Sequence, residues 1–358
     1  MLKLFKGRNQ SLVGLDVSAS AIKMIELVRD AEGYRVESYG VEPLPENTVV
    51  DQNIVELDVV AEAIKRLKAT SGFTAKWAAV AVSGSAVITK TIEVPASLNE
   101  VQIEEQLLLE ADQYIPYPLD EVALDFQVLG PSARSEDLLE VLLAACRREH
   151  VDARQAVLES AGLEPEVIDI EAHCVQRAIA LDLDLFSDPV EGQPQDVLAI
   201  VDIGADLTTL SVVQGSEVLY TREQMFGGRQ LTDEIQAKYG LNTAEAGYAK
   251  KFGGLPEDYE VEVLAPFKEA LLQQVMRSLQ FFYSATSYND VDRVVLAGGT
   301  ANLVGLTDLI ATRLGTPCSV ANPFDNMRIG PKVDQERLMA DAPAMMIACG
   351  LAMRDVDQ

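Results

Sequence analysis

The sequence predicts an α/β protein of two lobes, because strands alternate with helices in each half and one strand–turn–strand segment recurs. The chain has 358 residues, 48% of them hydrophobic, which is enough to bury two cores of ordinary size. The repeat aligns without a gap: Asp16 falls on Asp202, since 202 − 16 = 186, and Leu27 falls on Val213. A chance likeness of two strand–turn segments is the competing explanation. We expect two homologous lobes that face each other.

The first half opens with the repeated segment, residues 11–27, whose apolar and β-branched residues predict two strands around a short turn. Residues 34–39 follow a glycine-containing turn and pair back as a further strand. Apolar residues at helical spacing predict a helix over 55–69, and two more strands are expected over 77–83 and 87–94.

The sequence pattern changes from strand-like to helical near Pro95. Ser97 and Glu100 suggest a capping box for a helix that runs to about residue 114. Two strands, a loop between them and a closing helix with a glycine stop follow. The sequence therefore predicts an α-β-β-α subdomain inserted into the first lobe.

The second half follows a linker rich in proline, glycine and acidic residues at 187–194. A buried strand opens the second lobe, a mostly helical stretch follows, and a strand with a glycine turn returns to the sheet. The expected organisation is a first lobe over 1–94 and 163–190, an inserted subdomain over 95–162, a second lobe over 191–226 and 290–342, a helical subdomain over 227–289, and a C-terminal segment, 343–358, that packs back near the first lobe.

The charge balance limits the partners. Lys and Arg number 29 against 56 Asp and Glu, a net charge of −27, which disfavours nucleic acid and unaided binding to anionic membranes. No apolar stretch reaches the roughly 20 residues of a membrane span. Four scattered cysteines and two histidines predict neither a disulfide framework nor a zinc site. We expect a cytoplasmic protein with reduced cysteines and no direct membrane insertion.

The repeated aspartates suit phosphate chemistry. A carboxylate at the end of a buried strand can hold Mg²⁺, which prefers oxygen ligands, so Asp16 and Asp202 are the candidate metal ligands. Lys23 could reach a phosphate or could be a solvated strand residue. Small residues in the turns let backbone amides approach phosphate. The candidates for this role are Ser18, Ser20, Gly204, Thr208 and Thr209.

A third turn completes the candidate site. The run from Val294 to Ala297 predicts a buried strand, and Gly298 and Gly299 follow it directly. A double-glycine turn lets backbone lie against a nucleobase or ribose. With the two aspartate turns before it, this turn predicts a nucleotide site that also includes Thr300 and Asn302. No Walker A sequence occurs, which excludes a P-loop.

These three turns, in this order, resemble the superfamily of actin, heat-shock ATPases and sugar kinases, which has a ribonuclease H-like, two-lobed fold. Residues 169–178 and 348–353 resemble its two connecting helices. Within that superfamily, three segments resemble the type IV pilus protein family PilM, a relative of the cell-division protein FtsA. They are Gln113-Tyr-Ile-Pro-Tyr-Pro-Leu-Asp-Glu-Val-Ala-Leu-Asp125, Phe226-Gly-Gly-Arg-Gln-Leu-Thr232 and Phe281-Phe-Tyr-Ser284.

The resemblance implies an actin-like protein that binds ATP and Mg²⁺ between its lobes, with slow hydrolysis or none. It further implies binding of the cytoplasmic N-terminal peptide of the inner-membrane protein PilN, recruitment to the membrane through that partner, and coupling to the pilus motor ATPases. Gly227, Gly228 and Lys250 join the nucleotide site on this basis. Glu171 is the nearest acid that could orient water, and a capping role suits it equally.

Two departures from the family pattern stand out. Ser18 occupies a position where the superfamily usually has glycine, and Gly247 replaces the glutamate that relatives often carry three residues before Lys250. Two other functions also fit the fold. One is a self-associating, filament-forming cytoskeletal ATPase. The other is a small-molecule kinase, which needs a carboxylate base beside an acceptor pocket.

Overall fold

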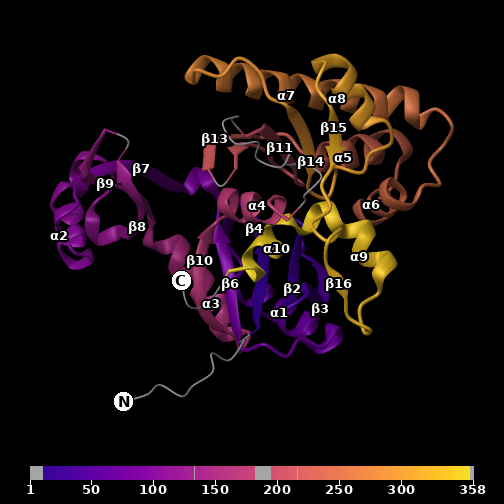
Figure 1. Cartoon of the computed structure of the whole chain (residues 1–358). Coiled ribbons are helices and arrows are strands. Elements are labelled where there is room, and N and C mark those ends of the chain that lie inside the picture. The colour runs from indigo at the N-terminus through magenta and orange to yellow at the C-terminus, as the bar shows by residue number, and fades with distance from the viewer. Residues whose placement is uncertain (1–10, 133, 182–194, 216, 355–358) are drawn as a thin grey trace.

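The computed structural model describes residues 11–132, 134–181, 195–215 and 217–354, and shows two facing lobes with a smaller unit projecting from the first (Figure 1). The predicted linker, 187–194, lies outside the described residues. Within the described ranges, no helix combines the length and the apolar character needed to cross a membrane.

The first lobe is built on a six-stranded sheet of order β10-β6-β1-β2-β3-β16. β1, β2 and β3 form an antiparallel meander, whereas β6 and β10 run parallel to β1. The strands are β1 Leu12–Val17, β2 Ala21–Asp30, β3 Gly33–Pro43, β6 Trp77–Val82, β10 Glu164–Ile170 and β16 Arg328–Ile329. A small hairpin of β4 Val49–Val50 and β5 Asn53–Ile54 lies apart from this sheet.

The second lobe repeats this plan with the order β13-β12-β11-β14-β15. In matched order the first sheet reads β3-β2-β1-β6-β10, so the duplication expected from the sequence is confirmed. The register agrees residue by residue, since Asp16 pairs with Lys23 and Asp202 pairs with Thr209. The strands are β11 Val197–Ile203, β12 Thr208–Gln214, β13 Glu217–Gln224, β14 Arg293–Ala297 and β15 Cys318–Val320.

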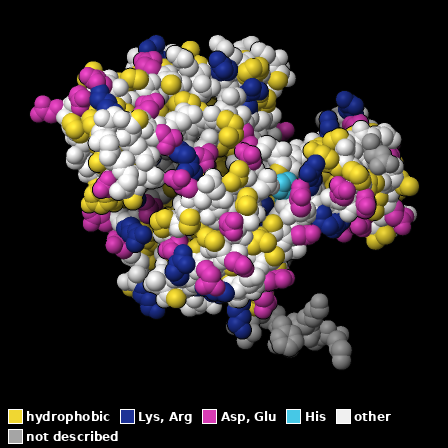
Figure 2. All heavy atoms as spheres, turned by 180° about the vertical axis from the view of Figure 1, so that it is seen from behind, with side chains coloured by type: hydrophobic (Ala, Val, Ile, Leu, Met, Phe, Trp, Pro, Cys, Tyr) yellow, Lys and Arg dark blue, Asp and Glu magenta, His cyan; other side chains and the backbone are white. Residues whose placement is uncertain are grey.

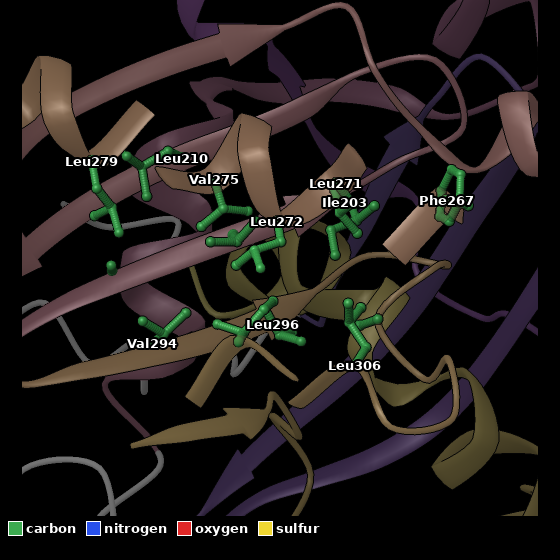
Figure 3. Close-up of a cluster of buried hydrophobic side chains, with 14 of the residues drawn as sticks. Ile203, Leu210, Phe267, Leu271, Leu272, Val275, Leu279, Val294, Leu296 and Leu306 are labelled. Atoms are coloured by element: carbon green, nitrogen blue, oxygen red, sulfur yellow. The ribbon is translucent and has the colours of Figure 1, made fainter. Parts of the chain in front are cut away.

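Helices cover the outer face of each sheet. α1 Leu57–Ser71 and α3 Arg148–Ser160 bury their apolar faces on the first sheet. Four helices cover the second sheet: α5 Gly228–Tyr239, α6 Thr243–Phe252, α7 Ala265–Ala285 and α8 Leu306–Leu314. Figure 3 shows an apolar stripe of α7, formed by Phe267, Leu271, Val275 and Leu279, packed toward Ile203, Leu210, Val294 and Leu296. Each Å² of apolar surface that this packing removes from water stabilises the folded state by roughly 25 cal/mol.

Two short helices lie between the lobes (Figure 1). They are α4 Glu171–Ile179 and α10 Met346–Ala352, and α9 Gln335–Asp341 precedes the latter. A Cβ on Gly350 would lie 1.9 Å from the Cys174 carbonyl oxygen, and one on Gly14 would lie 1.9 Å from that of Ala348. Only glycine permits these approaches, so α4 and α10, the two helices expected from the resemblance, cross at close range.

The projecting subdomain differs in extent from the prediction. Its sheet has the order β7-β9-β8, with β7 Val87–Pro95, β8 Val122–Ser132 and β9 Ser135–Arg147, and α2 Glu100–Glu110 packs on it. The sequence placed β7 in the first lobe, but β7 pairs with β9 along its whole length. The predicted closing helix, α3, packs on the first lobe instead. The capping box joins Asn99 and Gln102 rather than Ser97 and Glu100.

Acidic side chains are spread over the face seen in Figure 2, with basic side chains between them. Hydrophobic side chains gather on the projecting subdomain in the same view. The most exposed apolar residues there include Leu109, which is 84% exposed, and Val101, which is 64% exposed.

Candidate functional site

Four charged groups act on one another where the lobes meet. Asp16 ends β1, Lys23 faces it from β2, Asp202 ends β11 across the interface, and Glu171 begins α4. The Lys23 Nζ donates to Asp16 Oδ2 at 2.6 Å. Lys23 also feels the charges of Asp202 and Glu171. The duplication thus brings both predicted aspartates to one place, because each one ends the central strand of its sheet.

The Asp16–Lys23 pair is mostly shielded from water, because Asp16 is 3% exposed and the Lys23 side chain is 15% exposed. Burial lowers the pKa of Lys23, but the carboxylates of Asp16, Asp202 and Glu171 act against it and bring that pKa above its usual value. The ammonium therefore stays charged and is the cation available inside the site to a bound anion. A solvated strand role, the alternative reading, does not fit this burial.

Two carboxyl groups in the site have raised pKa values. Burial raises the pKa of Asp202 to about 6; Lys23 opposes this and Asp16 adds to it. Burial, with the Asp16 charge second, raises the pKa of Glu171 to about 8. Glu171 is therefore mostly protonated at neutral pH, whereas Asp202 is mostly ionised. Crowded carboxyls with separated pKa values are typical of sites that bind cations or move protons.

Arg154 on α3 is a charged neighbour that the sequence reading missed. It is 4% exposed, and its guanidinium donates to the carbonyl oxygens of Ala81 at 2.6 Å, His150 at 3.1 Å and Gln52 at 3.4 Å. Its charge lowers the pKa of Glu171 and so partly offsets the burial. No local motif signals this role, because it arises only when α3 packs on β6.

The double-glycine turn wraps the end of β11. Gly298 has a φ of +88°, and a Cβ there would lie 2.4 Å from Asp202 Oδ1. Its amide donates to the Pro343 carbonyl at 2.7 Å, and the Thr300 amide donates to Ile203 at 3.2 Å. Nothing lies within 4 Å of a Cβ built on Gly299, so that position faces open space. The turn therefore fixes Asp202 on one side and leaves a bare backbone surface on the other.

Gly227 and Gly228, at the start of α5, lie close to the turn after β11 and to Thr300 in the turn after β14. Gly228 donates to Gly204 at 2.9 Å, and a Cβ on it would lie 2.2 Å from Thr300 Oγ1. Lys250 of α6 donates to the Gly228 carbonyl at 2.9 Å and to Thr232 at 2.8 Å. Burial lowers the pKa of Lys250 to about 8. A Cβ on Gly227 would lie 2.3 Å from the Ala205 carbonyl, so this position also requires glycine.

The predicted hydroxyl groups mostly bond within the protein. Ser18 Oγ donates to the Ala21 carbonyl at 2.9 Å and closes the β1–β2 turn. Thr208 Oγ1 donates to Phe226 at 2.7 Å and holds the α5 turn in place. Ser20 is exposed, and Thr209 pairs with Asp202 in the ladder. Asn302 is exposed and donates to Ala340 at 3.3 Å, away from these groups.

A polar contact joins the lobes beside this cluster. Ser83 Oγ, which is fully buried, donates to Glu223 Oε1 of β13 at 2.6 Å, and the Ser85 amide donates to the same oxygen at 3.1 Å. The Glu223 charge also raises the pKa of Glu171. Ser83 and Ser85 flank the entry to β7, so this contact links the second lobe to the base of the projecting subdomain.

The donor set fits a magnesium-bound nucleotide. Among the described residues, no three His, Cys, Asp or Glu side chains are grouped to hold a metal by themselves. Mg²⁺ usually takes one or two carboxylates and completes its shell with water and substrate phosphates. Asp16 and Asp202 could supply these carboxylates, and the Lys23 ammonium could bind a phosphate. The Gly298–Gly299 backbone offers a surface free of side chains.

Comparison with known proteins identifies the relatives. The family model described as type IV pilus assembly protein PilM matches residues 14–356. A solved PilM-PilN type IV pilus biogenesis complex contains a chain with 28% identity and a TM-score of 0.79, covering 97% of this chain and 99% of that one. The ethanolamine utilization protein EutJ from Carboxydothermus hydrogenoformans shares the fold, with 16% identity and a TM-score of 0.56 over 95% of this chain and 88% of its own.

The cell division protein FtsA of Bacillus subtilis (strain 168) is 24% identical over 361 residues, which span 88% of this chain and 79% of FtsA. Together with the repeated sheet order, these relatives confirm the actin-like fold expected from the sequence. The family match covers both lobes and the inserted subdomain. The chain belongs to the type IV pilus assembly protein PilM family.

Proposed function

We propose that this chain is a cytoplasmic, nucleotide-dependent assembly platform of the type IV pilus machine. The observation that carries the proposal is its likeness to the PilM chain of a PilM-PilN complex over nearly its full length. The charged cluster between the lobes supports the nucleotide part, because two duplicated aspartates and Lys23 suit Mg²⁺ and phosphate.

In this proposal Asp202 is the principal metal ligand and Lys23 contacts phosphate, while Asp16 orients Lys23. Mg²⁺ would supply charge neutralisation to the phosphates. The turn at Gly298, Gly299 and Thr300, with Gly228 and Lys250 beside it, would hold the nucleoside. Gly204 and the backbone of the Ser18 turn would face the phosphates from the two lobes, whereas Asn302 would position the turn from outside.

Glu171 supports slow hydrolysis at most. Burial raises the pKa of Glu171 to about 8, so only a minor fraction of this side chain is ionised and able to act as a general base at neutral pH. The protonated acid can still orient a water molecule by hydrogen bonding. We therefore propose a protein that mainly holds ATP and responds to it by lobe closure.

One contact between the lobes links lobe closure to the projecting subdomain in this proposal. The Glu223 contacts with Ser83 and Ser85 cross from the second lobe to the base of the projecting subdomain. A nucleotide that bridges the lobes would favour the conformation in which these contacts are made. We propose that the N-terminal peptide of PilN binds the conformation so selected and recruits the chain to the inner membrane.

The proposal extends to larger assemblies. The exposed apolar side chains of the projecting subdomain offer a surface for the pilus motor ATPases or for self-association. Gradient sedimentation of the chain with and without MgATP, at rising concentration, tests self-association. A sedimentation coefficient independent of concentration would count against that part.

Nucleotide occupancy tests the nucleotide part. The purified protein is denatured and the released nucleotide is identified by chromatography, with Asp202→Ala prepared in parallel. We expect adenine nucleotide from the wild type and its loss from the variant. If the wild type neither carries nor binds ATP with Mg²⁺, the nucleotide part is wrong.

A synthetic PilN N-terminal peptide tests the partner part separately. Its affinity, measured by fluorescence anisotropy, should rise when MgATP is added to the wild type. The variant Glu223→Ala, which removes the acceptor of both bonds, should keep the affinity without nucleotide and lose the nucleotide-dependent increase. No peptide binding in either state would contradict the platform role, whatever the nucleotide result.

A further inference from the structure

A second recessed site lies at the outer edge of the first sheet, away from the charged cluster. Its volume is about 350 Å³, and it covers residues 37–42 of β3. Leu67 and Ser71 of α1 form one wall, whereas Lys332, Asp334 and Arg337 form the other. Figure 1 shows β3, β16 and α9 together at this side of the molecule. The cavity therefore follows a strand edge and is walled on both sides.

The edge of β3 is open along this cavity. β16 pairs with β3 only at Arg35 and Val36, although β3 continues to Pro43. On the other side, β3 pairs with β2 along its length. Just past β16 the Gly330 amide donates to the Val36 carbonyl at 2.8 Å, and from Ser38 onward no strand pairs with this edge in the described part of the chain. Such an edge is a template for another strand.

The pairing of β3 with β2 shows which backbone N–H and C=O groups of β3 point away from β2. Leu44 donates to the Ser20 carbonyl at 2.9 Å, so its backbone faces β2. Backbone groups alternate along a strand, so Glu42 and Gly40 also face β2, whereas Val41 and Tyr39 face outward. Pro43 falls on the outward side, where its missing N–H breaks no ladder bond. Tyr39 and Val41 thus present amides and carbonyls to the cavity.

The charges around the cavity divide by sign. Glu37 pairs with Arg35 at 3.0 Å, Glu42 pairs with Arg66 at 2.8 Å, and Asp334 accepts from the Arg337 amide at 3.1 Å as a helix cap. Within the described residues, no ion pair engages Lys332 or the Arg337 guanidinium. Glu37 and Glu42 are therefore ion-paired, Asp334 is a helix cap that keeps its charge, and the two cationic side chains are available to an incoming anion.

Tyr39 adds a donor to this wall. Its side chain is 8% exposed, and its hydroxyl has no hydrogen-bond partner in the described structure. Burial raises the pKa of the phenol, Asp341 adds to this through its charge and as a nearby acceptor side chain, and Arg337 opposes it, so the hydroxyl keeps its proton and lies near both Asp341 and Arg337. A buried donor without a full hydrogen bond is unfavourable, so a peptide acceptor held by Arg337 would gain a bond from this hydroxyl.

We propose that this cavity binds an extended, acidic peptide segment of a partner protein, which adds a strand to the edge of β3 at Tyr39 and Val41. Its backbone pairs with the outward groups, and one carboxylate lies between Lys332 and Arg337. The net charge of −27 does not prevent this, because charges beyond about 8 Å are screened at physiological ionic strength. The site is separate from the nucleotide cluster.

Hydrogen exchange by NMR tests the site with a defined probe. The probe is a short capped peptide of alternating threonine and glutamate, and its control has lysine in place of glutamate. In the free protein the amides of Tyr39 and Val41 should exchange faster than those of Gly40 and Glu42. The acidic peptide should protect them with a Kd of about 1 mM or tighter, and the lysine peptide should bind at least about tenfold more weakly.

Two variants locate the binding. Val41→Pro removes the outward N–H and should weaken the acidic peptide about tenfold, whereas Val41→Thr keeps the N–H and the β-branch and should bind as wild type. Arg337→Glu should abolish the preference for the acidic peptide. Equal binding of both peptides overturns the charge argument. No protection of Tyr39 and Val41 by the acidic peptide overturns the site, and peptide-free protection that rises with protein concentration assigns the edge to a second copy instead.

Discussion

The turn after β14 holds the Asp202 carboxylate through a glycine. Gly298 has positive φ, and a Cβ there would overlap Asp202 Oδ1 and the Ile203 carbonyl. The site therefore depends on a residue that contributes no functional group. This explains why a double-glycine turn follows the strand, and it separates the two glycines: Gly298 is required by packing, whereas Gly299 faces open space.

Gly298→Ala should destabilise the fold by about 1–3 kcal/mol, because both the backbone conformation and the contact with Asp202 become strained. Chemical denaturation measures the change in unfolding free energy. Gly299→Ala is the matched control and should stay within about 0.5 kcal/mol of wild type. Equal effects of the two substitutions would contradict the packing seen around Asp202.

Glu171 makes stability depend on pH. Its folded pKa is about 8 against a usual 4.5, so its ionised form is disfavoured by folding. The stability it contributes is complete below pH 4.5 and is lost as the pH rises through 8. Glu171→Gln removes this titration, so the variant should melt a few degrees above wild type beyond pH 8 and alike near about pH 5. Thermal melts across that window test this, and a pH-independent difference would contradict it.

At the level of elements, the crossing of α4 and α10 holds the lobes together. The two helices share a core with strands from both sheets, including Ile25 and Val295. Arg177 donates to the Gly350 carbonyl at 2.6 Å and pairs with Asp169 at 2.9 Å. The interface between the lobes thus combines the Arg177 hydrogen bond and ion pair with a shared apolar core.

Gly350→Ala should cost about 3 kcal/mol, because its Cβ would meet the Cys174 carbonyl at 1.9 Å and force the helices apart. Gly247→Ala on α6 is the matched helical control, since nothing lies within 4 Å of its Cβ. Higher helix propensity should stabilise that control by about 0.5–1 kcal/mol. Guanidinium unfolding measures both, and a neutral Gly350→Ala would contradict the close crossing.

Local pattern predicted most elements, because strand alternation and helical spacing are set by neighbours in sequence. It failed where tertiary pairing decides: β7 reads as a strand of either unit, and only its ladder with β9 assigns it to the projecting subdomain. α3 likewise carries an amphipathic pattern that suits either core, and it packs beside α1. Arg154 and Glu223 were missed because their partners are distant in sequence.

Across the whole molecule, the duplication explains why the site lies between the lobes. Each lobe supplies one aspartate at the end of its central strand, and residues at matched positions differ: Lys23 in the first lobe corresponds to Thr209 in the second. The repeat could therefore be found from sequence alone, and it predicted the candidate residues. The β3 cavity could not be predicted, because its two walls come from segments more than 260 residues apart in the sequence and no motif joins them.

In the proposed function, the affinity for MgATP should depend on the ionisation of Asp202. Because its pKa is raised to about 6, affinity should be constant above neutral pH and should fall by up to about tenfold per unit below pH 6. Lys23→Ala should weaken binding at every pH without removing this profile. A pH-independent affinity would exclude Asp202 as a metal ligand.

Calorimetric titration of the nucleotide-free protein with MgATP tests the central claim most directly. The wild type should bind one nucleotide, and Asp202→Asn, which keeps the shape of the side chain and removes its charge, should bind at least about tenfold more weakly, a loss of about 1.4 kcal/mol. Omission of Mg²⁺ should weaken the wild type and leave the variant nearly unchanged. If the wild type shows no binding, or if both proteins bind alike with and without Mg²⁺, the nucleotide site between the lobes is contradicted.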